Sequence, residues 1–351
     1  MRVLSDSDVV HYLNHHVTKN SLEQQFIPKM VEALTTFSHD PDAIVPPRIV
    51  RESNNKNSDT THLYMPCISP NEVGIKIISG GPTNNKLGLG FAGCVLILDE
   101  ITGSAKALLN ANTLTAFRTA LASVSGMTKI LGSKPVLPEI TVFGVGLQAY
   151  WHLKLALNLY GDKITTVNVV NRTLANAEKL SDKLGGEFPT TKFNAFLYQE
   201  LNHKQEIASH CQNSSIIFGC SPSTDPIILD EYINKDNKYA KFISLIGSYK
   251  PHMIELDLAT VKRLQASKTS IIVDAKEHCL HEAGELIQGN VTENQLVELT
   301  ELYGPNGVGN VVDPEINLTV QKLVGLSIMD LSIGKLIVDN VNEEGVVIEN
   351  F

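Results

Sequence analysis

The sequence has few charged and few aromatic residues, and basic residues are fewer than acidic ones. The deficit of basic residues argues against nucleic acid and anionic membranes as partners. Charged residues make up 19% of the 351 residues and aromatic residues 6%. Acidic residues outnumber basic residues, 38 to 29, which gives a formal net charge of −9. Such a chain is repelled by nucleic acid and by anionic membrane surfaces, although a local basic pocket for phosphate is compatible with it. We expect neither nucleic acid nor a membrane as its partner.

Cysteine and long apolar runs are also scarce. The five cysteines are odd in number, scattered and without a CxxC pair, which indicates reduced side chains and not a disulfide framework. The first residues, MRVLSDSDVVHYLNHH, lack the apolar segment of a signal peptide. No apolar stretch approaches the roughly 18 residues of a membrane span. These absences predict a soluble protein in the reducing cytoplasm.

Several catalytic motifs are missing as well. The sequence has no P-loop lysine and no HExxH, and Ser123–Gly126 is not the GxSxG elbow of a serine hydrolase. Four polar residues would share one face of a helix: His278, His281, Glu282 and Glu285. That spacing suits a metal site, but a solvated polar face is the simpler interpretation. We expect no resident metal.

The length of 351 residues exceeds what one hydrophobic core usually serves, so two domains are expected. The first part has predicted helices at 6–14, 22–37 and 114–131, and predicted strands at 61–66, 73–79, 93–99 and 105–110. Ser5 and Asp8 are typical of a capping box before the first helix, and 99–103 is typical of a hairpin turn. This part is predicted to be mixed α+β and largely antiparallel.

The pattern changes after Pro135. Five short apolar runs follow, at 139–143, 165–170, 215–220, 242–247 and 270–274. Helical or mixed segments separate the first four, and strands that alternate with helices predict a parallel sheet covered on both faces. We predict a doubly wound, Rossmann-type α/β domain at 131–311 and a first domain made of 1–130 and 312–351. Residues 316–340 are predicted to form one helix that packs back on the first domain.

A phosphate-binding turn follows the first strand of the second domain. Gly144-Val145-Gly146-Leu147-Gln148-Ala149 has the GxGxxA pattern between that strand and a predicted helix. Gly144 permits the tight turn, Gly146 lets the backbone approach a pyrophosphate, and Ala149 lets the helix lie close to the strand. The N–H groups at the helix N-terminus then bind the pyrophosphate. We predict that these six residues bind a dinucleotide; a strand–helix turn with nothing bound is the alternative.

The end of the next strand predicts which dinucleotide is bound. A site that prefers NAD usually has an Asp or Glu here for the ribose hydroxyls, whereas this chain has Asn171-Arg172-Thr173. A guanidinium can bind a 2′-phosphate through two hydrogen bonds and can stack on adenine. The sequence therefore favours NADP(H), with NAD(H) as an alternative, and assigns these three residues to the cofactor. A solvated Arg172 is the simpler interpretation.

Three basic residues of the first part stand in unusual surroundings. Lys76 interrupts an apolar strand, Arg118 lies in an otherwise apolar helix start, and Arg48 follows two prolines. A buried ammonium requires an acidic partner, an anion or a cleft, and its lowered pKa suits proton transfer. Two arginines and a lysine that converge would bind a carboxylate. Three separate structural ion pairs are the alternative. Thr119, next to Arg118, is predicted to contact the cofactor.

The order of these motifs resembles the ornithine cyclodeaminase/mu-crystallin family over roughly residues 3–340. The resemblance rests on Pro46-Pro47-Arg48, Leu63-Tyr64-Met65-Pro66, Gly74-Ile75-Lys76, Leu114–Ala120, Gly144–Ala149, Asn171-Arg172-Thr173, Glu255-Leu256-Asp257, Val273-Asp274, Glu282–Leu286, Val324-Gly325 and Asp330. It implies a homodimer whose first domain supplies the dimer contact and the floor of the substrate site, and a bound nicotinamide cofactor. It also implies that Arg48, Lys76 and Arg118 hold the substrate carboxylate or stand beside the reacting carbon.

Departures from the family pattern separate its branches. Ornithine cyclodeaminases carry a catalytic Asp at the position of Tyr249, and a Glu for the distal amine of the substrate where this chain has Leu63, with His62 adjacent. Asn110-Ala111 stands where members more often have Asp-Gly. The mu-crystallin branch likewise lacks the Asp and has an NADP-type Asn-Arg-Thr, so this chain is more similar to that branch.

The resemblance and the departures together predict an NADPH-dependent reductase of a small imino acid, such as a cyclic Δ1-imine-2-carboxylate, in amino acid metabolism. Lys76 would bind the carboxylate or deliver a proton to nitrogen. An ornithine cyclodeaminase-type lyase, which forms proline and ammonia, is one alternative. A non-catalytic, NADPH-dependent protein that binds a small ligand is a second. An amino acid dehydrogenase or a condensing synthase can also use this scaffold, because fold does not fix chemistry.

Overall fold

The computed structural model describes residues 1–233, 239–248, 250–341 and 344–351. The chain divides into two compact units, one of residues 1–118 with 325–351 and the other of residues 119–324. The first boundary falls within helix α6, Ala111–Leu131, which begins where Asn110 Oδ1 accepts the backbone N–H of Asn112. Within the described ranges, no helix is long and apolar enough to cross a membrane.

The first unit contains a seven-stranded sheet of order β15-β1-β6-β5-β4-β3-β2. Its strands are β1 Arg2–Leu4, β2 Ile49–Glu52, β3 Thr61–Ile68, β4 Val73–Gly80, β5 Ala92–Leu98, β6 Ala105–Asn110 and β15 Val346–Val347. The pair β1–β6 is parallel and the other neighbouring pairs are antiparallel. The prediction of a mixed, largely antiparallel part is confirmed.

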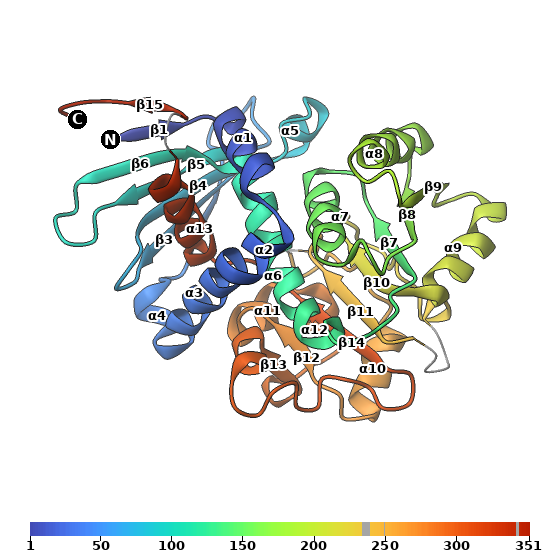
Figure 1. Ribbon diagram of the computed structural model, residues 1–351. Helices are drawn as coiled ribbons and strands as arrows, with labels where there is room; N and C mark the ends of the chain where they lie inside the picture. The colour runs from blue at the N-terminus through green and yellow to red at the C-terminus, as the bar shows by residue number, and fades with distance from the viewer. Residues whose placement is uncertain (234–238, 249, 342–343) are drawn as a thin grey trace. The chain divides into compact units, whose positions relative to one another are not determined.

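The first unit also contains helices, some of which cover one face of this sheet. They are α1 Asp6–His16, α2 Lys19–Ser21, the π-helical turn η1 Leu22–Phe26, α3 Ile27–His39, α4 Pro41–Ile44, α5 Pro82–Lys86 and α13 Ser327–Asn340. The capping box of Ser5 and Asp8 opens α1 as predicted. In Figure 1, α13 lies against the strands of this sheet beside α3, and its contacts are with β3, β4, β5 and α3.

The register of the sheet separates a buried face from a more exposed one. Met65, Lys76, Val95 and Leu109 are cross-strand neighbours on the face that the helices cover, and all four are buried. On the opposite face the neighbours are apolar but only half-buried or exposed, among them Tyr64, Pro66, Ile75, Ile77, Cys94, Leu96 and Leu108. This opposite face is called the open face below.

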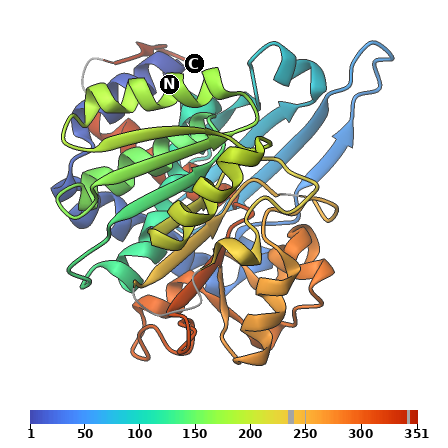
Figure 2. The ribbon, with the colours of Figure 1, turned by 90° about the vertical axis from the view of Figure 1, so that its right-hand side faces the viewer.

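The second unit is built on an eight-stranded sheet of order β13-β12-β14-β11-β10-β7-β8-β9, in which every pair is parallel. Its strands are β7 Glu139–Phe143, β8 Thr166–Asn171, β9 Lys192–Leu197, β10 Ser214–Gly219, β11 Lys241–Leu245, β12 Ile271–Val273, β13 Leu296–Glu298 and β14 Leu318–Lys322. Figure 2 shows the strands of this unit running side by side. The predicted Rossmann-type sheet is confirmed.

Helices connect these strands. They are α7 Leu147–Tyr160, α8 Leu174–Glu187, α9 Leu201–Asn213, α10 Leu258–Ala266, α11 Lys276–Glu282 and α12 Gly284–Gln288, with 3₁₀ turns η2 Asp230–Tyr232, η3 Glu293–Gln295 and η4 Leu299–Tyr303. The chain leaves β7 toward β8 and β9 on one side and returns to β10 and β11 on the other. Such a reversal of strand order is where open parallel sheets bind ligands, at the carboxyl ends of the strands.

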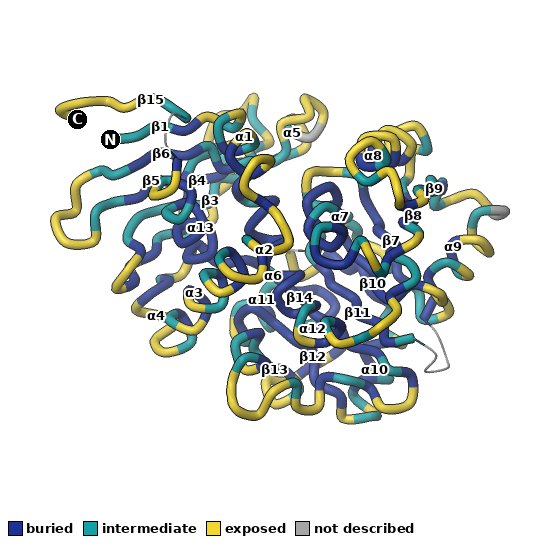
Figure 3. Tube along the Cα trace, in the orientation of Figure 1, coloured by how far each residue is buried: buried dark blue, intermediate teal, exposed yellow. Residues whose placement is uncertain are grey.

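The prediction of a single helix over 316–340 was wrong. Residues Leu318–Lys322 form β14, which lies between β11 and β12, and the helix begins only at Ser327. Every residue of β14 is buried, and the strand is dark blue along its length in Figure 3, as are β10 and β11. The sequence of β14, Leu-Thr-Val-Gln-Lys, alternates apolar and polar residues, but five residues are too few to separate a strand clearly from the helix that follows. The C-terminal part, α13, does pack within the first unit.

The segment with the four polar residues is also not one helix. It forms α11 and α12, separated by the extended residue Ala283, so Glu285 does not share a helix face with His278, His281 and Glu282. The described residues contain no group of three or more His, Cys, Asp or Glu arranged to hold a metal ion.

Candidate functional site

The turn after β7 has the geometry that its sequence pattern predicts. Gly144 adopts φ +119°, and a β-carbon there would lie 2.6 Å from the carbonyl oxygen of Cys220. Gly146 is the N-cap of α7, and a β-carbon there would meet no described atom within 4 Å. The turn is therefore tight on one side and open on the other. The open side exposes the first N–H groups of α7, which suit an anion. Ala149 is buried.

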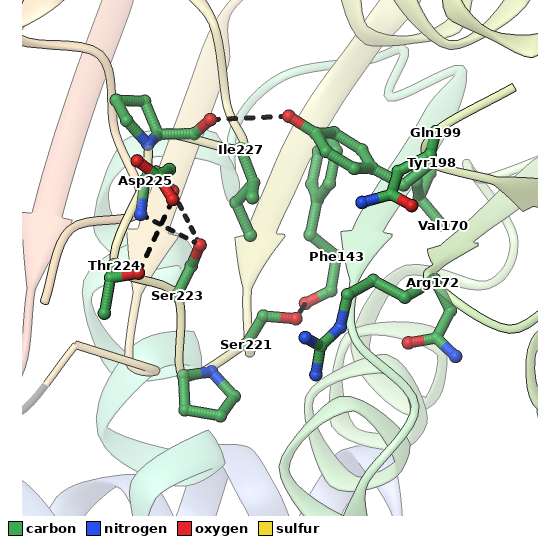
Figure 4. A pocket seen from close by; sticks show the side chains of 13 residues that line it. Phe143, Val170, Arg172, Tyr198, Gln199, Ser221, Ser223, Thr224, Asp225 and Ile227 are labelled. Atoms are coloured by element: carbon green, nitrogen blue, oxygen red, sulfur yellow. Dashed lines mark hydrogen bonds between the residues drawn. The ribbon is translucent and has the colours of Figure 1, made fainter.

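A cavity lies at the carboxyl ends of β7, β8 and β10, next to this turn. Its volume is about 280 Å³, and Phe143, Val170, Asn171, Arg172, Tyr198, Gln199 and Ser221–Ile227 line it. Arg172 is exposed and follows β8 directly, so its guanidinium can reach a bound anion. In Figure 4 the Arg172 side chain extends toward Ser221. Asn171 Nδ2 donates to the carbonyl oxygen of Thr173, which shapes the loop that carries Arg172.

The remaining predicted cofactor residues occupy two places. Val145, Gly146 and Leu147 line a second cavity of about 310 Å³, to which Lys179 and Lys183 of α8 also contribute. Thr119 is buried on α6, and Gln148 lies in the first turn of α7. Their assignment to a cofactor stays a prediction.

Lys76 is paired with a buried carboxylate in the first unit. It is fully buried on β4, and its Nζ donates to Asp330 Oδ1 at 2.7 Å and to Thr115 Oγ1 at 2.8 Å. Burial lowers the pKa of Lys76 to about 7; Asp330 opposes that shift, and the nearby charges of Arg118 and Arg48 add to it. The Lys76 ammonium can therefore gain or release a proton near neutral pH, as a proton donor requires.

Arg118 shares the same carboxylate. Its Nε lies 3.1 Å from Asp330 Oδ2, an ion pair without hydrogen-bond geometry. Its Nη1 donates to the thioether of Met329, which is a weak acceptor. A β-carbon at Gly325 would lie 2.8 Å from Nη1, so the guanidinium needs a glycine beside it. Arg118 therefore retains strong donor capacity for an anion, because a guanidinium offers five N–H donors.

Arg48 completes the group. It is half-buried in the loop before β2, and its Nη2 donates to the carbonyl oxygen of Gly325 at 2.9 Å. Since Arg118 and Arg48 both act on the charge of Lys76, the structure brings the three predicted basic residues together. Lys76 and Arg118 share the Asp330 carboxylate, and Arg48 is hydrogen-bonded to Gly325, against which the Arg118 guanidinium also lies.

The register of β3 shows which of Leu63 and His62 shares a face of the sheet with Lys76. Leu63 pairs with Ile78 on the face that holds Lys76, whereas His62 pairs with Ser79 on the opposite face and hydrogen-bonds its hydroxyl at 2.8 Å. The residues of β3 on the face of Lys76 are Thr61, Leu63, Met65 and Cys67, and none of them is a carboxylate. Tyr249, which stands at the position of the cyclodeaminase Asp, lies outside the described residues.

Sequence reasoning gave no role to Asp330, although it was part of the family motifs. Its pairing with Lys76 spans 254 residues of sequence, and no local pattern connects two such positions. The available signal was the residue type: Asp330 is a carboxylate in the first turn of α13, where the neighbouring residues are apolar and buried. An isolated charge in such a segment requires a partner.

Comparison with known proteins gives consistent results. Residues 8–345 match the Ornithine cyclodeaminase/mu-crystallin family. An uncharacterised protein of Saccharomyces cerevisiae is 33% identical over 310 residues, 81% of this chain and 82% of that protein. The ketimine reductase mu-crystallin of Rattus norvegicus is 28% identical over 332 residues, 93% of this chain and 94% of that protein.

Solved structures share the fold over the full length. The Δ1-pyrroline-2-carboxylate reductase of Thermococcus litoralis, in complex with NADH and L-proline, has a TM-score of 0.79 at 23% identity and covers 99% of this chain and 100% of its own. An archaeal alanine dehydrogenase dimer with bound NAD has a TM-score of 0.77 at 20% identity and covers 100% of this chain and 99% of its own. At these identities the likeness shows the fold.

Proposed function

The chain belongs to the ornithine cyclodeaminase/mu-crystallin family, and on that premise we propose that it is an NAD(P)H-dependent reductase of a small imino acid, such as a cyclic Δ1-imine-2-carboxylate. The observation that carries the proposal is that Lys76 and Arg118 share the buried carboxylate of Asp330, with Arg48 on Gly325 beside them. Two guanidinium groups suit a carboxylate substrate, and the buried lysine suits proton transfer.

The reaction needs a hydride on carbon and a proton on nitrogen. A reduced nicotinamide cofactor, which the turn Gly144–Ala149 and Arg172 would hold, would supply the hydride that turns the C=N double bond into a C–N single bond. Arg118 and Arg48 bind the carboxylate, for which a guanidinium has matching geometry. Lys76 delivers the proton to nitrogen, and Asp330 holds its ammonium in place through the 2.7 Å hydrogen bond.

The direct test is oxidation of NADPH, followed by absorbance, in the presence of Δ1-pyrroline-2-carboxylate or Δ1-piperideine-2-carboxylate. The proposal expects stoichiometric formation of the cyclic amino acid. Absence of turnover with cyclic and linear imino acids, while NADPH binds, would favour a protein that only binds small ligands. Formation of proline and ammonia from ornithine without net use of NADPH would identify a lyase instead; the lack of a carboxylate on β3 beside Lys76 speaks against that outcome.

NADP(H) is the proposed cofactor, and Arg172 is the residue proposed to select it. An Arg172→Ala change is expected to weaken NADPH binding by about tenfold to 100-fold, because a charge-assisted bond to the 2′-phosphate is lost. NADH lacks that phosphate, so its affinity is expected to change little. Calorimetric titration with both nucleotides measures the effect. Lys192→Ala is the control, because Lys192 is an exposed cation at the first residue of β9, at the opposite end of the sheet. Equal losses for NADPH and NADH would contradict the assignment.

We also propose that two copies of the chain associate through the open face of the first unit. An antiparallel sheet with one solvated face normally alternates apolar and polar residues, but this face presents Tyr64, Ile75, Ile77 and Leu96. Tyr64→Arg is expected to convert a dimer to a monomer in analytical ultracentrifugation, because it places a charge on the apolar surface. Ile101→Arg, in the hairpin turn where Ile101 is 90% exposed, should leave the mass unchanged. A Tyr64→Arg protein that remains dimeric would exclude this face.

A further inference from the structure

A buried cluster of two glutamates and a lysine lies at the carboxyl ends of β10, β11 and β14. Glu255, Glu285 and Lys322 are each at most 1% exposed. They lie in the second unit, beside the loops that follow the central strands. Two buried carboxylates near one ammonium are costly to hold unless each makes several hydrogen bonds. Packing alone therefore does not account for these three buried charges.

Glu255 ties two loops together through their backbones. Its Oε1 accepts the N–H of Ser221, in the loop after β10, at 3.0 Å. Its Oε2 accepts the N–H of Gly247 at 2.7 Å and of Ser248 at 3.2 Å, in the loop after β11. The fit is close, since a β-carbon at Gly247 would lie 2.6 Å from Oε1 and one at Gly219 would lie 2.8 Å from it.

Glu285 and Lys322 hold the second of these loops in turn. Glu285 Oε1 accepts the hydroxyl of Ser248 at 2.6 Å and the backbone N–H of Glu255 at 2.8 Å. Lys322 Nζ donates to the carbonyl oxygen of Ser248 at 2.6 Å and also to its hydroxyl oxygen, and it lies 3.7 Å from Glu285 Oε2. Three charged side chains thus converge on one serine.

The loop after β10 leads directly to the dinucleotide features. Ser221 lines the cavity that contains Arg172, and its hydroxyl donates to the carbonyl oxygen of Phe143 at 3.3 Å. Phe143 precedes the phosphate turn, where Gly144 packs against Cys220. A carboxylate that fixes Ser221 therefore also fixes one wall of that cavity and the backbone next to the turn.

We propose that Glu255 is a positioning residue for dinucleotide binding, and that its ionised carboxylate holds the loops after β10 and β11 in the conformation that binds the cofactor. The proposal rests on the proposed function, since it takes NAD(P)H as the ligand. Protonation removes acceptor capacity from the carboxylate, so the loops lose backbone contacts and affinity falls.

The surroundings of Glu255 determine the pH at which its ionised form, and with it the nucleotide affinity, is lost. Burial raises its pKa to about 7, Lys322 on β14 lowers it, Glu285 on α12 raises it, and the backbone N–H groups of Ser221 and Gly247 lower it. Cys220 also lies beside it, and burial keeps the pKa of that thiol well above its usual value, so it stays neutral. The ionised form of Glu255 is lost as the pH falls through about 7.

The test is calorimetric titration of the full-length protein with NADPH and with NADH between about pH 5.5 and pH 8.5. The affinity of the unmodified protein for both nucleotides is expected to fall as the pH decreases through the titration of Glu255. Using NADH separates this effect from protonation of the 2′-phosphate, whose pKa is about 6. Glu255→Gln is expected to bind both nucleotides about tenfold more weakly at high pH, and its affinity for NADH should not depend on pH.

A second variant shifts the pH midpoint of nucleotide affinity and keeps the Glu255 carboxylate. Glu285→Gln removes a neighbouring negative charge, so the midpoint should shift to lower pH, which a merely structural role would not produce. Asp313→Asn is the matched control, because Asp313 is a buried carboxylate that accepts the N–H groups of Glu315 and Ile316 before β14, at the other end of the sheet. The pH dependence of nucleotide affinity in Asp313→Asn should match that of the unmodified protein.

The outcomes separate this proposal from the proposed function. If the unmodified protein binds neither nucleotide at any pH, the cofactor assignment itself fails. If it binds both with a flat pH profile, or if Glu255→Gln matches it, only the role of Glu255 is overturned. Should Glu255→Gln not fold, the profile of the unmodified protein and the midpoint of Glu285→Gln still decide.

Discussion

Lys76→Met is expected to reduce imine turnover by about 100-fold to 10,000-fold, the range that a general acid contributes. Methionine retains the length and the apolar stem of the lysine in a fully buried position, so the packing on β4 is preserved while the proton donor is lost. The affinity for NADPH should stay unchanged, since the proposed cofactor residues of the phosphate turn and Arg172 belong to the second unit. Steady-state kinetics together with NADPH titration measure both effects.

The pH profile provides the sharper measurement. Lys76 donates only when it is protonated, and its pKa is lowered to about 7, so kcat/KM should fall as the pH rises through about 7. The residual kcat/KM of Lys76→Met should not show this fall as the pH rises through about 7. Lys29→Met is the control, because Lys29 is a partly buried lysine of the same unit that pairs with Glu72 and Glu32. Unchanged turnover in Lys76→Met would remove Lys76 from the chemistry.

Asp330→Asn is expected to destabilise the protein and to shift the same pH profile. Removing one partner of a buried ion pair typically costs about 3–5 kcal/mol, and here Lys76 and Arg118 both lose their counter-charge. Lys76 can limit the loss by releasing its proton, because its pKa falls further once the carboxylate that raises it is gone. The falling limb of kcat/KM should therefore move to lower pH.

Urea unfolding and the pH dependence of turnover measure these two consequences separately. Asp339→Asn on the same helix is the control: Asp339 is 45% exposed and pairs with Lys106 at 2.8 Å. Exposed pairs of this kind contribute about 0–1 kcal/mol, so the control should change stability little and the pH profile not at all. If kcat/KM of Asp330→Asn falls at the same pH as in the unmodified protein, Asp330 does not set the charge of Lys76.

The features that could be predicted from the sequence are local ones. The strand β7, the glycine turn and α7 are consecutive, and their small residues have a direct steric purpose, so one window of sequence contains the whole argument. The alternation of strands and helices likewise predicts a parallel sheet before any pairing is known. Lys76 was recognisable because a charge in an apolar strand is rarely accidental.

What could not be predicted depends on contacts between distant segments. β14 was taken for part of a helix because it is only five residues long and its neighbours in the sheet, β11 and β12, come earlier in the chain. Asp330 and Glu255 belong to the same class. The role of each depends on partners on other elements. Asp330 pairs with Lys76 and Arg118, and Glu255 binds the loops after β10 and β11.

The composition of the first unit, residues 1–118 with 325–351, has a consequence for biosynthesis. The strand that carries Lys76 leaves the ribosome long before α13, which carries its counter-charge and covers the sheet. Until α13 has been synthesised, the sheet exposes a lysine and an apolar face that this helix will cover. Nascent chains of this kind are prone to aggregation. Premature termination before Ser327 should therefore yield a product that depends on chaperones, although it would contain both arginines and the lysine of the proposed substrate site.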